Sequence, residues 1–299
     1  MKKRTITIAA VISTALLFGG VVLLVRDDAR QAQKTAAVQS YGPTQEMQDK
    51  LDKITESLTS ETVPVSSEPQ ETLSGTVPEL DSETENIPDT LAMAEITESS
   101  VQDSSITLPA EIYHQLQDNV QSLTDAYPDA VGWLYLPDTN INYPLMQGED
   151  NEFYLHHAYD GSHLTSGSVF LDCRCNPNFM NPINVVYAHN MKNGSMFAGL
   201  VKFKDSAYFY SHRYGWLSIA DKVYRIDFFS VAVADWQDSI YDGSQPISGW
   251  ISRIQNLSQI SAGISYAETD RFISLSTCSD EFANARTVLT GKLTELKEE

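Results

Sequence analysis

One cysteine near the C-terminus lies where an apolar run meets a polar loop. The stretch "RFISLSTCSD", Arg271 to Asp280, has the composition of a strand that ends at Cys278. The 299 residues contain only three cysteines. A thiol at the rim of a sheet, followed by small and polar residues, is open to a substrate, but most single cysteines are inert. Its position makes Cys278 a candidate nucleophile that needs partners.

Two other side chains have positions from which they could assist this thiol. His189 follows the apolar run "NVVYA" at the start of a polar loop, the same strand-end placement as Cys278. Arg286 comes eight residues after Cys278, at the start of the strand-like run "RTVLTGKL". A loop of that length can return Arg286 beside Cys278. A lone histidine is more often structural and an arginine more often a surface charge, so spacing alone does not show that the three meet.

Together the three side chains have the chemistry needed for acyl transfer. The thiolate is the reactive form of cysteine, and nearby cations stabilise it. A histidine can protonate a departing amine and then deprotonate an entering one. A guanidinium donates several hydrogen bonds and can hold the oxyanion of a tetrahedral intermediate or a substrate carbonyl.

The two remaining cysteines, Cys173 and Cys175, lie in "LDCRCNPN". A C-x-C pair supplies two metal ligands, whereas a site needs three or four. So few cysteines also exclude a disulfide scaffold. We interpret Cys173 and Cys175 as incidental thiols and expect no metal site and no cofactor.

The elements that must position these residues are mostly strands. Between residues 131 and 293, short runs rich in Val, Ile, Tyr and Phe are separated by Gly, Asn, Asp and Pro. This pattern predicts an antiparallel barrel or sandwich. The runs are "VGWLYL", "INYPLM", "GSVFLD", "INVVYAH", "YGWLSIA", "KVYRIDFFSVAVAD", "RFISLSTC" and "RTVLTGKL".

Two helices accompany the strands. Before the first strand, Ile112, Leu116, Val120 and Leu123 recur at helical spacing and Pro128 ends the pattern. Between two late strands, "GSQPISGWISRIQNLSQIS" has a second apolar face, with Ser244 placed to cap the helix and Pro246 in its first turn. The apolar residues of this second face are Ile247, Trp250, Ile251, Ile254 and Leu257.

Several of these motifs together resemble one enzyme family, the sortases. "SLSTC" resembles their T-L-S-T-C motif, with Ser274 at the first position, "YAHN" resembles their histidine strand, and Arg286 matches their arginine. The stretch from Pro128 to Asp172 resembles class B sortases in particular, as do the two helices. The similarity covers nearly all of Ile106 to Leu293. It implies an α+β fold, mainly β with peripheral helices: a closed β-barrel with an N-terminal helix and a helical insertion between late strands.

The resemblance also implies the activity and the roles of the site residues. Cys278 would attack the carbonyl of a Thr in a C-terminal sorting signal and form a thioacyl enzyme. His189 would act as general acid and then base, and Arg286 would hold the substrate or the oxyanion. Asp280 is a further candidate, for orienting a neighbour. Residues implied to line the peptide groove are Asn151, Leu155, Ser276 and Thr277.

The N-terminal third of the chain has a different composition. Residues 1–5 carry "KKR", and residues 6–25 are uncharged and long enough to span a bilayer. The flanking positive charges place the N-terminus in the cytoplasm and the rest outside. Residues 26–105 are rich in Ser, Thr, Glu and Pro, which predicts a disordered tether with a reach of about 50 Å. Residues 106–299 form the predicted extracellular catalytic domain.

The expected partners follow from the charge and from the resemblance. The net charge of −20 argues against nucleic acid. The resemblance implies a membrane-anchored transpeptidase of a Gram-positive bacterium, which joins proteins bearing a sorting signal to an amine of the lipid-linked peptidoglycan precursor. Two alternatives with the same residues remain open: a pilin polymerase with a lysine acceptor, and a tethered cysteine peptidase. A binding domain with a retired active site is disfavoured, because Cys278, His189 and Arg286 are all present.

Overall fold

The computed structural model of the chain describes residues 26–62 and 107–299. The predicted cytoplasmic stub (1–5), the predicted span (6–25) and residues 63–105 of the predicted tether lie outside the described residues. Within the two described segments, no helix is both long enough and apolar enough to cross a membrane.

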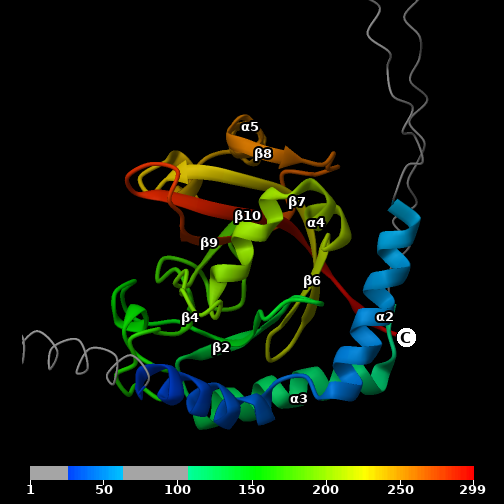
Figure 1. Ribbon diagram of the computed structural model, residues 1–299. Coiled ribbons are helices and arrows are strands. Elements are labelled where there is room, and N and C mark those ends of the chain that lie inside the picture. The colour runs from blue at the N-terminus through cyan, green and yellow to red at the C-terminus, as the bar shows by residue number, and fades with distance from the viewer. Residues whose placement is uncertain (1–25, 63–106) are drawn as a thin grey trace, which may run out of the picture.

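A closed β-barrel forms the centre of the structure (Figure 1). In the described part of the chain, eight strands pair in the order β10-β9-β5-β4-β3-β2-β6-β7, and β7 pairs with β10 to close the ring. The strand runs alone left a barrel and a sandwich open, and the β7–β10 ladder decides for the barrel. The expectation that all strands are antiparallel is wrong at β3–β4 and β5–β9, which are parallel because the chain crosses between them instead of turning back in a hairpin. The strands are β2 (Ala130–Tyr135), β3 (Asn142–Met146), β4 (Val169–Leu171), β5 (Ile183–Tyr187), β6 (Tyr214–Ser218), β7 (Val223–Asp235), β9 (Arg271–Cys278) and β10 (Ala285–Glu295).

The barrel interior is filled by alternate residues of these strands. On β9, Ile273 and Leu275 belong to the interior cluster, whereas Phe272 belongs to a cluster outside the barrel wall. Because side chains alternate along a strand, Cys278 shares the outer face with Phe272 and Ser276. The thiol is therefore presented outside the packed barrel.

The shorter elements are η1 (Gln39–Tyr41), β1 (Thr107–Leu108), η2 (Phe153–Leu155), η3 (Phe197–Lys204), α4 (Ser206–Ser211), η4 (Ser239–Tyr241), β8 (Ser258–Ser261) and β11 (Lys297–Glu298).

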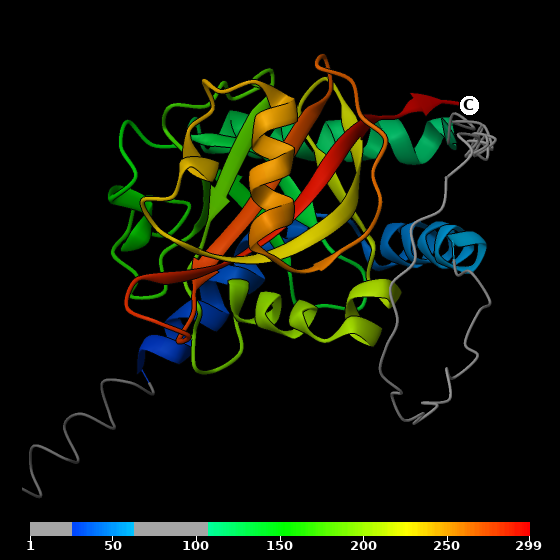
Figure 2. The ribbon, with the colours of Figure 1, turned by 90° about the horizontal axis from the view of Figure 1, so that it is seen from above.

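The two predicted helices are present. Helix α3 (Ala110–Ala126) buries the four apolar residues that the spacing predicts. Helix α5 (Ile247–Leu257) lies across the outer face of β7, β9 and β10 (Figure 2), where Trp250 packs on Phe272. Ser244 does not cap this helix: the Glu268 carboxylate accepts hydrogen bonds from the first backbone N–H groups, those of Ile247 (3.0 Å) and Ser248 (3.1 Å).

Residues 26–62 differ from the sequence-based expectation of a disordered tether. Residues 26–38 and α2 (Gln45–Thr62) are helical and lie beside α3 and the barrel (Figure 1). Val38, Met47 and Leu51 are buried in one cluster with α3. The low hydrophobicity of this segment concealed its few apolar residues, which the folded domain covers. The structure thus corrects the expectation for residues 26–62.

Candidate active site

Strand register brings Cys278, His189 and Arg286 to one end of the barrel. Arg286 lies directly opposite Cys278 in the antiparallel β9–β10 ladder. Strand β5 runs parallel to β9, with Tyr187 opposite Ser276, so that its next residues lead to His189 beside the end of β9. The residues between Cys278 and Arg286 therefore form a hairpin loop, which returns the chain to the same end of the barrel.

All three side chains line one open groove of about 790 Å³. The thiol of Cys278 is exposed, and it makes no hydrogen bond to any other described residue. A groove of this size holds several residues of an extended peptide, with the thiol open to a backbone carbonyl. Besides the three, its lining residues are Asn151, Glu152, Leu155, Phe170, Arg174, Tyr187, Ala188, Trp236, Gln237, Asp238, Ser239, Tyr241, Asp242, Ser276 and Thr277.

One hydrogen bond fixes the orientation of the His189 ring. Its Nε2 lies 2.9 Å from the carbonyl oxygen of Leu155. A carbonyl only accepts, so Nε2 carries the hydrogen. In the neutral ring, Nδ1 is then the nitrogen that can take up a proton. The backbone of Leu155 thereby leaves Nδ1 as the ring nitrogen that is free of this bond.

The position of the Leu155 carbonyl depends on a glycine close to it. Gly167 has φ = +58°, and a Cβ at this position would lie 2.3 Å from the oxygen of Tyr154 and 2.5 Å from that of Leu155. Only glycine combines this left-handed conformation with so close an approach. The chain returns past Leu155 at Gly167 and Ser168, whose N–H donates to the Tyr154 oxygen (2.9 Å).

Polar contacts also tie the end of β5 to the end of β9. The Thr277 hydroxyl donates to the backbone oxygen of Ala188 (2.8 Å), and the Asn190 amide donates to the backbone oxygen of Cys278 (3.0 Å). These bonds hold the residues on either side of His189 against the end of β9. The Arg286 guanidinium donates to the backbone oxygens of Ala285 (3.0 Å) and Asn284 (3.3 Å), at the start of its own strand.

Comparison with known proteins places this site in a family. No protein-family profile matches the chain. Sortase B of Listeria monocytogenes is 31% identical over 185 residues, which cover 60% of this chain and 75% of that protein. The chain belongs to the class B sortases.

The solved structure of Clostridium perfringens sortase B matches with a TM-score of 0.55 and 33% identity, covering 58% of this chain and 98% of that one. A class B sortase of Streptococcus pyogenes involved in pilus biogenesis matches with a TM-score of 0.55 and 28% identity, covering 58% and 97%. This sortase is accordingly a cysteine transpeptidase.

Asn151, Leu155, Ser276 and Thr277 all line the open groove of this sortase, and their roles in peptide binding stay predictions. The Asn151 side-chain oxygen accepts from the N–H of Cys173 (2.8 Å), and Leu155 contributes the carbonyl that orients His189. Thr277 is buried and its hydroxyl is bonded to Ala188, so its side chain holds the strands together. The hydroxyl of Ser276 is bonded to that of Tyr241 (3.0 Å).

Asp280 lies apart from the groove. It is exposed and lines a separate surface hollow with Asn190, Lys204 and Glu281. Within the described chain, its carboxylate makes no hydrogen bond to a residue of the groove. The structure therefore gives no contact through which Asp280 orients a catalytic group.

Sequence reasoning missed a charged cluster in the wall of the sortase groove. Asp172 is only 1% exposed and accepts two hydrogen bonds from the Arg174 guanidinium (2.9 and 2.7 Å) and one from the Tyr187 hydroxyl (3.1 Å). Burial on its own would raise the pKa of Asp172, but the hydrogen bonds from Arg174 outweigh it and lower that pKa below its usual range. Arg174 is thereby held as a cation at the groove. The sequence signal was small: an Asp at the end of the apolar run "GSVFLD".

A neutral phenol adjoins this cluster. Burial raises the pKa of Tyr241 to about 12, so its hydroxyl keeps its proton at neutral pH. The hydroxyl pairs with Ser276, and the backbone oxygen of Tyr241 accepts a hydrogen bond from Arg174 (3.4 Å). Tyr241 thus joins the Asp172–Arg174 cluster to β9, and nothing in the sequence around "SIYDG" indicated this.

The lowered pKa of Asp172 predicts a pH-dependent contribution to stability. A carboxyl whose pKa is lower in the folded state stabilises the fold above its unfolded pKa of about 3.9, and that stabilisation is lost as the pH falls through the folded value. We expect Asp172→Asn to reduce the free energy of unfolding by about 1–3 kcal/mol at pH 7, because the Arg174 pair is lost. The difference from wild type should shrink below pH of about 4.

Thermal unfolding from pH 7 down to pH 3 measures this difference. The matched control is Asp118→Asn, an exposed carboxyl on α3 that makes no hydrogen bond to a described residue; it should follow the wild type at every pH. A difference between Asp172→Asn and wild type that stays constant down to pH 3 would contradict the role of the charged form.

Proposed function

We propose that this sortase joins surface proteins to the bacterial cell wall. It recognises a sorting signal near the C-terminus of a secreted protein and cleaves the chain after a Thr. It then transfers the new carboxyl end to an amine of the lipid-linked peptidoglycan precursor. Residues 6–25 are proposed to anchor it in the cell membrane, with the N-terminus in the cytoplasm and the barrel outside.

The observation that carries the proposal is the open groove in which an exposed Cys278 lies with His189 and Arg286. An open groove admits an extended peptide as the acyl donor and then an amine as the acyl acceptor, as the two steps of transpeptidation require. Membership of the class B sortases supports the same reaction.

The proposed reaction has two steps, acylation of Cys278 and transfer of the acyl group to the amine. The Cys278 thiolate adds to the Thr carbonyl carbon, and the Arg286 guanidinium donates hydrogen bonds to the oxyanion. The peptide C–N bond breaks as the imidazolium of His189 gives a proton to the departing amine, leaving a thioester. The acceptor amine attacks the thioester, His189 takes its proton, and the Cys278 thiolate leaves as the new amide forms. With Nε2 bonded to Leu155, the proton exchanged is the one on Nδ1.

A peptide-library experiment tests the proposal. The full chain, purified in detergent, is incubated with quenched fluorescent peptides that vary around a central Thr, with and without triglycine, diaminopimelic acid amide or a lysine peptide. We expect cleavage after Thr and, by mass spectrometry, an amide adduct with a cell-wall-type amine. Cleavage that yields only the free acid with every amine would instead identify a cysteine peptidase.

A second acceptor class has one specific argument in its favour. The matching Streptococcus pyogenes enzyme is involved in pilus biogenesis. A lysine side chain is an amine of the same kind, and the groove residues do not distinguish it from a peptidoglycan amine. An adduct formed with the lysine peptide in preference to the other two would make this sortase a pilin polymerase.

A further inference from the structure

Two hairpins meet at the His189 ring. The first, here called the His189 hairpin (residues 189–197), begins at His189 and closes where the N–H of Phe197 donates to the His189 oxygen (3.0 Å). The second, the Leu155 hairpin (residues 154–168), presents the carbonyl that accepts from Nε2 and closes where Ser168 donates to Tyr154. The orientation of the ring thus depends on the relative position of two hairpins.

Residues 26–38, here called the strap, are helical and contact the tip of the His189 hairpin. The Gln31 amide donates to the hydroxyl of Ser195 (2.7 Å), and the Asp28 carboxylate accepts from the Asn193 amide (2.9 Å). Gln31 is only 5% exposed, which is unusual for a glutamine on a helix at the protein surface. The bonds to the tip satisfy its buried amide.

The same strap contacts the outer part of the Leu155 hairpin. Lys34 forms an ion pair with Asp160, and the Asp27 carboxylate accepts from the Thr165 hydroxyl (2.9 Å). A longer contact joins the Arg30 guanidinium to the backbone oxygen of His163 (3.5 Å). Hence one helix of 13 described residues bridges both hairpins.

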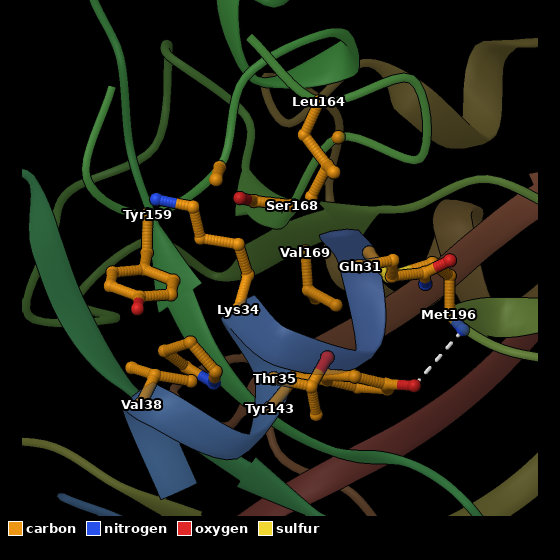
Figure 3. A pocket seen from close by; sticks show the side chains of 13 residues that line it. Gln31, Lys34, Thr35, Val38, Tyr143, Tyr159, Leu164, Ser168, Val169 and Met196 are labelled. Carbon is orange, nitrogen blue, oxygen red and sulfur yellow. Dashed lines mark hydrogen bonds between the residues drawn. The ribbon is translucent and has the colours of Figure 1, made fainter. Parts of the chain in front are cut away.

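Packing beneath the strap adds to these polar bonds. Figure 3 shows Gln31, Lys34, Thr35 and Val38 of the strap lining one pocket together with Tyr143, Tyr159, Leu164, Ser168, Val169 and Met196. These residues surround a cavity of only about 30 Å³, so the strap is closely packed on the barrel and on both hairpins. Val38, at its end, is 2% exposed.

The His189 hairpin contains a backbone conformation that needs external support. Met196 has φ = +57°, which is unfavourable for a residue with a Cβ. Such a conformation is strained and persists where the surroundings impose it. Here the Tyr143 hydroxyl accepts from the Met196 N–H (3.1 Å), and the adjacent Ser195 is held by Gln31. The strap therefore acts on the segment of the hairpin that carries the strain.

We propose that the strap is a positioning segment for His189: by holding the His189 hairpin and the Leu155 hairpin together, it keeps the Nε2–H to Leu155 bond made and Nδ1 available for proton transfer. The proposal rests on the proposed acid–base role of His189. Without the strap, the two hairpins separate, the bond to Leu155 is broken in part of the molecules, and the ring populates its other tautomer.

Three variants of the full chain test the strap. Gln31→Ala removes the bond to Ser195. Gln33→Pro breaks the helix at an exposed position whose own side chain makes no bond to a described residue. Glu56→Pro is the matched control, because it breaks α2 at an exposed position, and α2 is bonded to the barrel strands through Asp52 with Tyr135 and Thr55 with Trp216.

Two readouts separate positioning from general damage. Long-range ¹H–¹⁵N NMR of the histidine rings reports the tautomer of His189, with His189→Gln used for assignment. Peptide cleavage gives kcat and KM. We expect Gln31→Ala and Gln33→Pro to lower the Nε2–H population and to reduce kcat by about ten- to a hundredfold with KM within about twofold, since a displacement of about 1 Å at a reacting group costs up to about a hundredfold. Glu56→Pro should lower the unfolding temperature but leave the tautomer and kcat as in wild type.

A rescue experiment uses the ion pair. Lys34→Glu places two carboxylates together and should lower kcat in the same way, whereas adding Asp160→Lys restores the pair in reverse and should recover most of the loss. An unchanged tautomer in both Gln31→Ala and Gln33→Pro, or the same change in Glu56→Pro, would overturn the proposal. A changed tautomer with unchanged kcat would support the positioning by the strap and contradict the catalytic role of His189.

Discussion

Replacing Cys278 with alanine should reduce kcat/KM for peptide cleavage by at least about a thousandfold and abolish the amide adduct. The reason is that no other group in the groove can form the thioester, and removing a nucleophile costs most of the rate enhancement of an enzyme that works through a covalent intermediate. Cleavage of a quenched sorting-signal peptide by the full chain gives the rate. Mass spectrometry of the protein mixed with peptide gives the acyl-enzyme, which should be present in wild type and missing in the variant.

The chain offers two matched controls for this prediction. Cys173 and Cys175 are free and partly buried, and neither lines the groove. Cys173→Ala should keep kcat/KM within about twofold, because it removes a thiol without touching the nucleophile. Iodoacetamide should modify the exposed Cys278 first, with loss of activity in step with that modification. An acyl-enzyme that persists in Cys278→Ala, or full activity after its alkylation, would show that another residue is the nucleophile.

Replacing His189 with alanine should lower kcat/KM by about 10²- to 10⁴-fold, the usual contribution of a general acid–base catalyst. The loss should affect both half-reactions, since the same ring gives a proton to the departing amine and takes one from the acceptor amine. Single-turnover experiments measure thioester formation, and release of the preformed thioester by added amine measures the second step.

A neighbouring imidazole provides the control for His189. The ring of His156 lies beside that of His189, with centroids 6.1 Å apart, but it is exposed and does not line the groove. His156→Ala should leave both half-reactions within about threefold of wild type, as expected for a side chain outside the reacting groups. Equal losses in the two variants would mean that the local charge, rather than proton transfer by His189, supports the reaction.

The parts of the fold that local pattern encodes could be predicted from the sequence. The β9 and β10 runs and the short loop between them require an antiparallel hairpin, so the alignment of Arg286 with Cys278 follows from spacing. The four apolar residues of α3 and those of α5 follow from helical periodicity. The acyl-transfer activity was predicted from the resemblance to sortases, because the sequence spacing does not show that His189 lies in the same groove as Cys278.

What could not be predicted depends on contacts between distant segments. The parallel pairing of β5 with β9 joins residues almost 90 positions apart, and nothing local encodes it. From the sequence, Asp172 is only the polar residue at the end of a strand. In the fold it is buried and bonded to Arg174 and Tyr187. Glu268 caps α5 from 20 and 21 residues away along the chain, so the prediction of the nearer Ser244 as the cap was wrong.

The tether was the largest error of this kind. A segment with so few apolar residues does not fold by itself, and its helices are stabilised by the barrel. Trp216 donates to the hydroxyl of Thr55 (3.2 Å) and Tyr135 donates to Asp52 (2.6 Å), bonds that exist only once the barrel has formed. The composition of residues 26–62 indicates whether the segment folds alone, but not whether it packs on the barrel.

The docking of residues 26–62 changes how the enzyme would be attached to the cell. Residues 63–106 join two segments that both pack on the barrel. The connection between the proposed anchor and the catalytic domain therefore runs through the strap and not through this stretch. The barrel would instead be held close to the bilayer by the strap and α2. A single protease cut within residues 63–106 would then leave a two-chain enzyme that is still attached and assembled. Release of the barrel from the cell surface would require the strap and α2 to detach from it, which would also remove the support of His189.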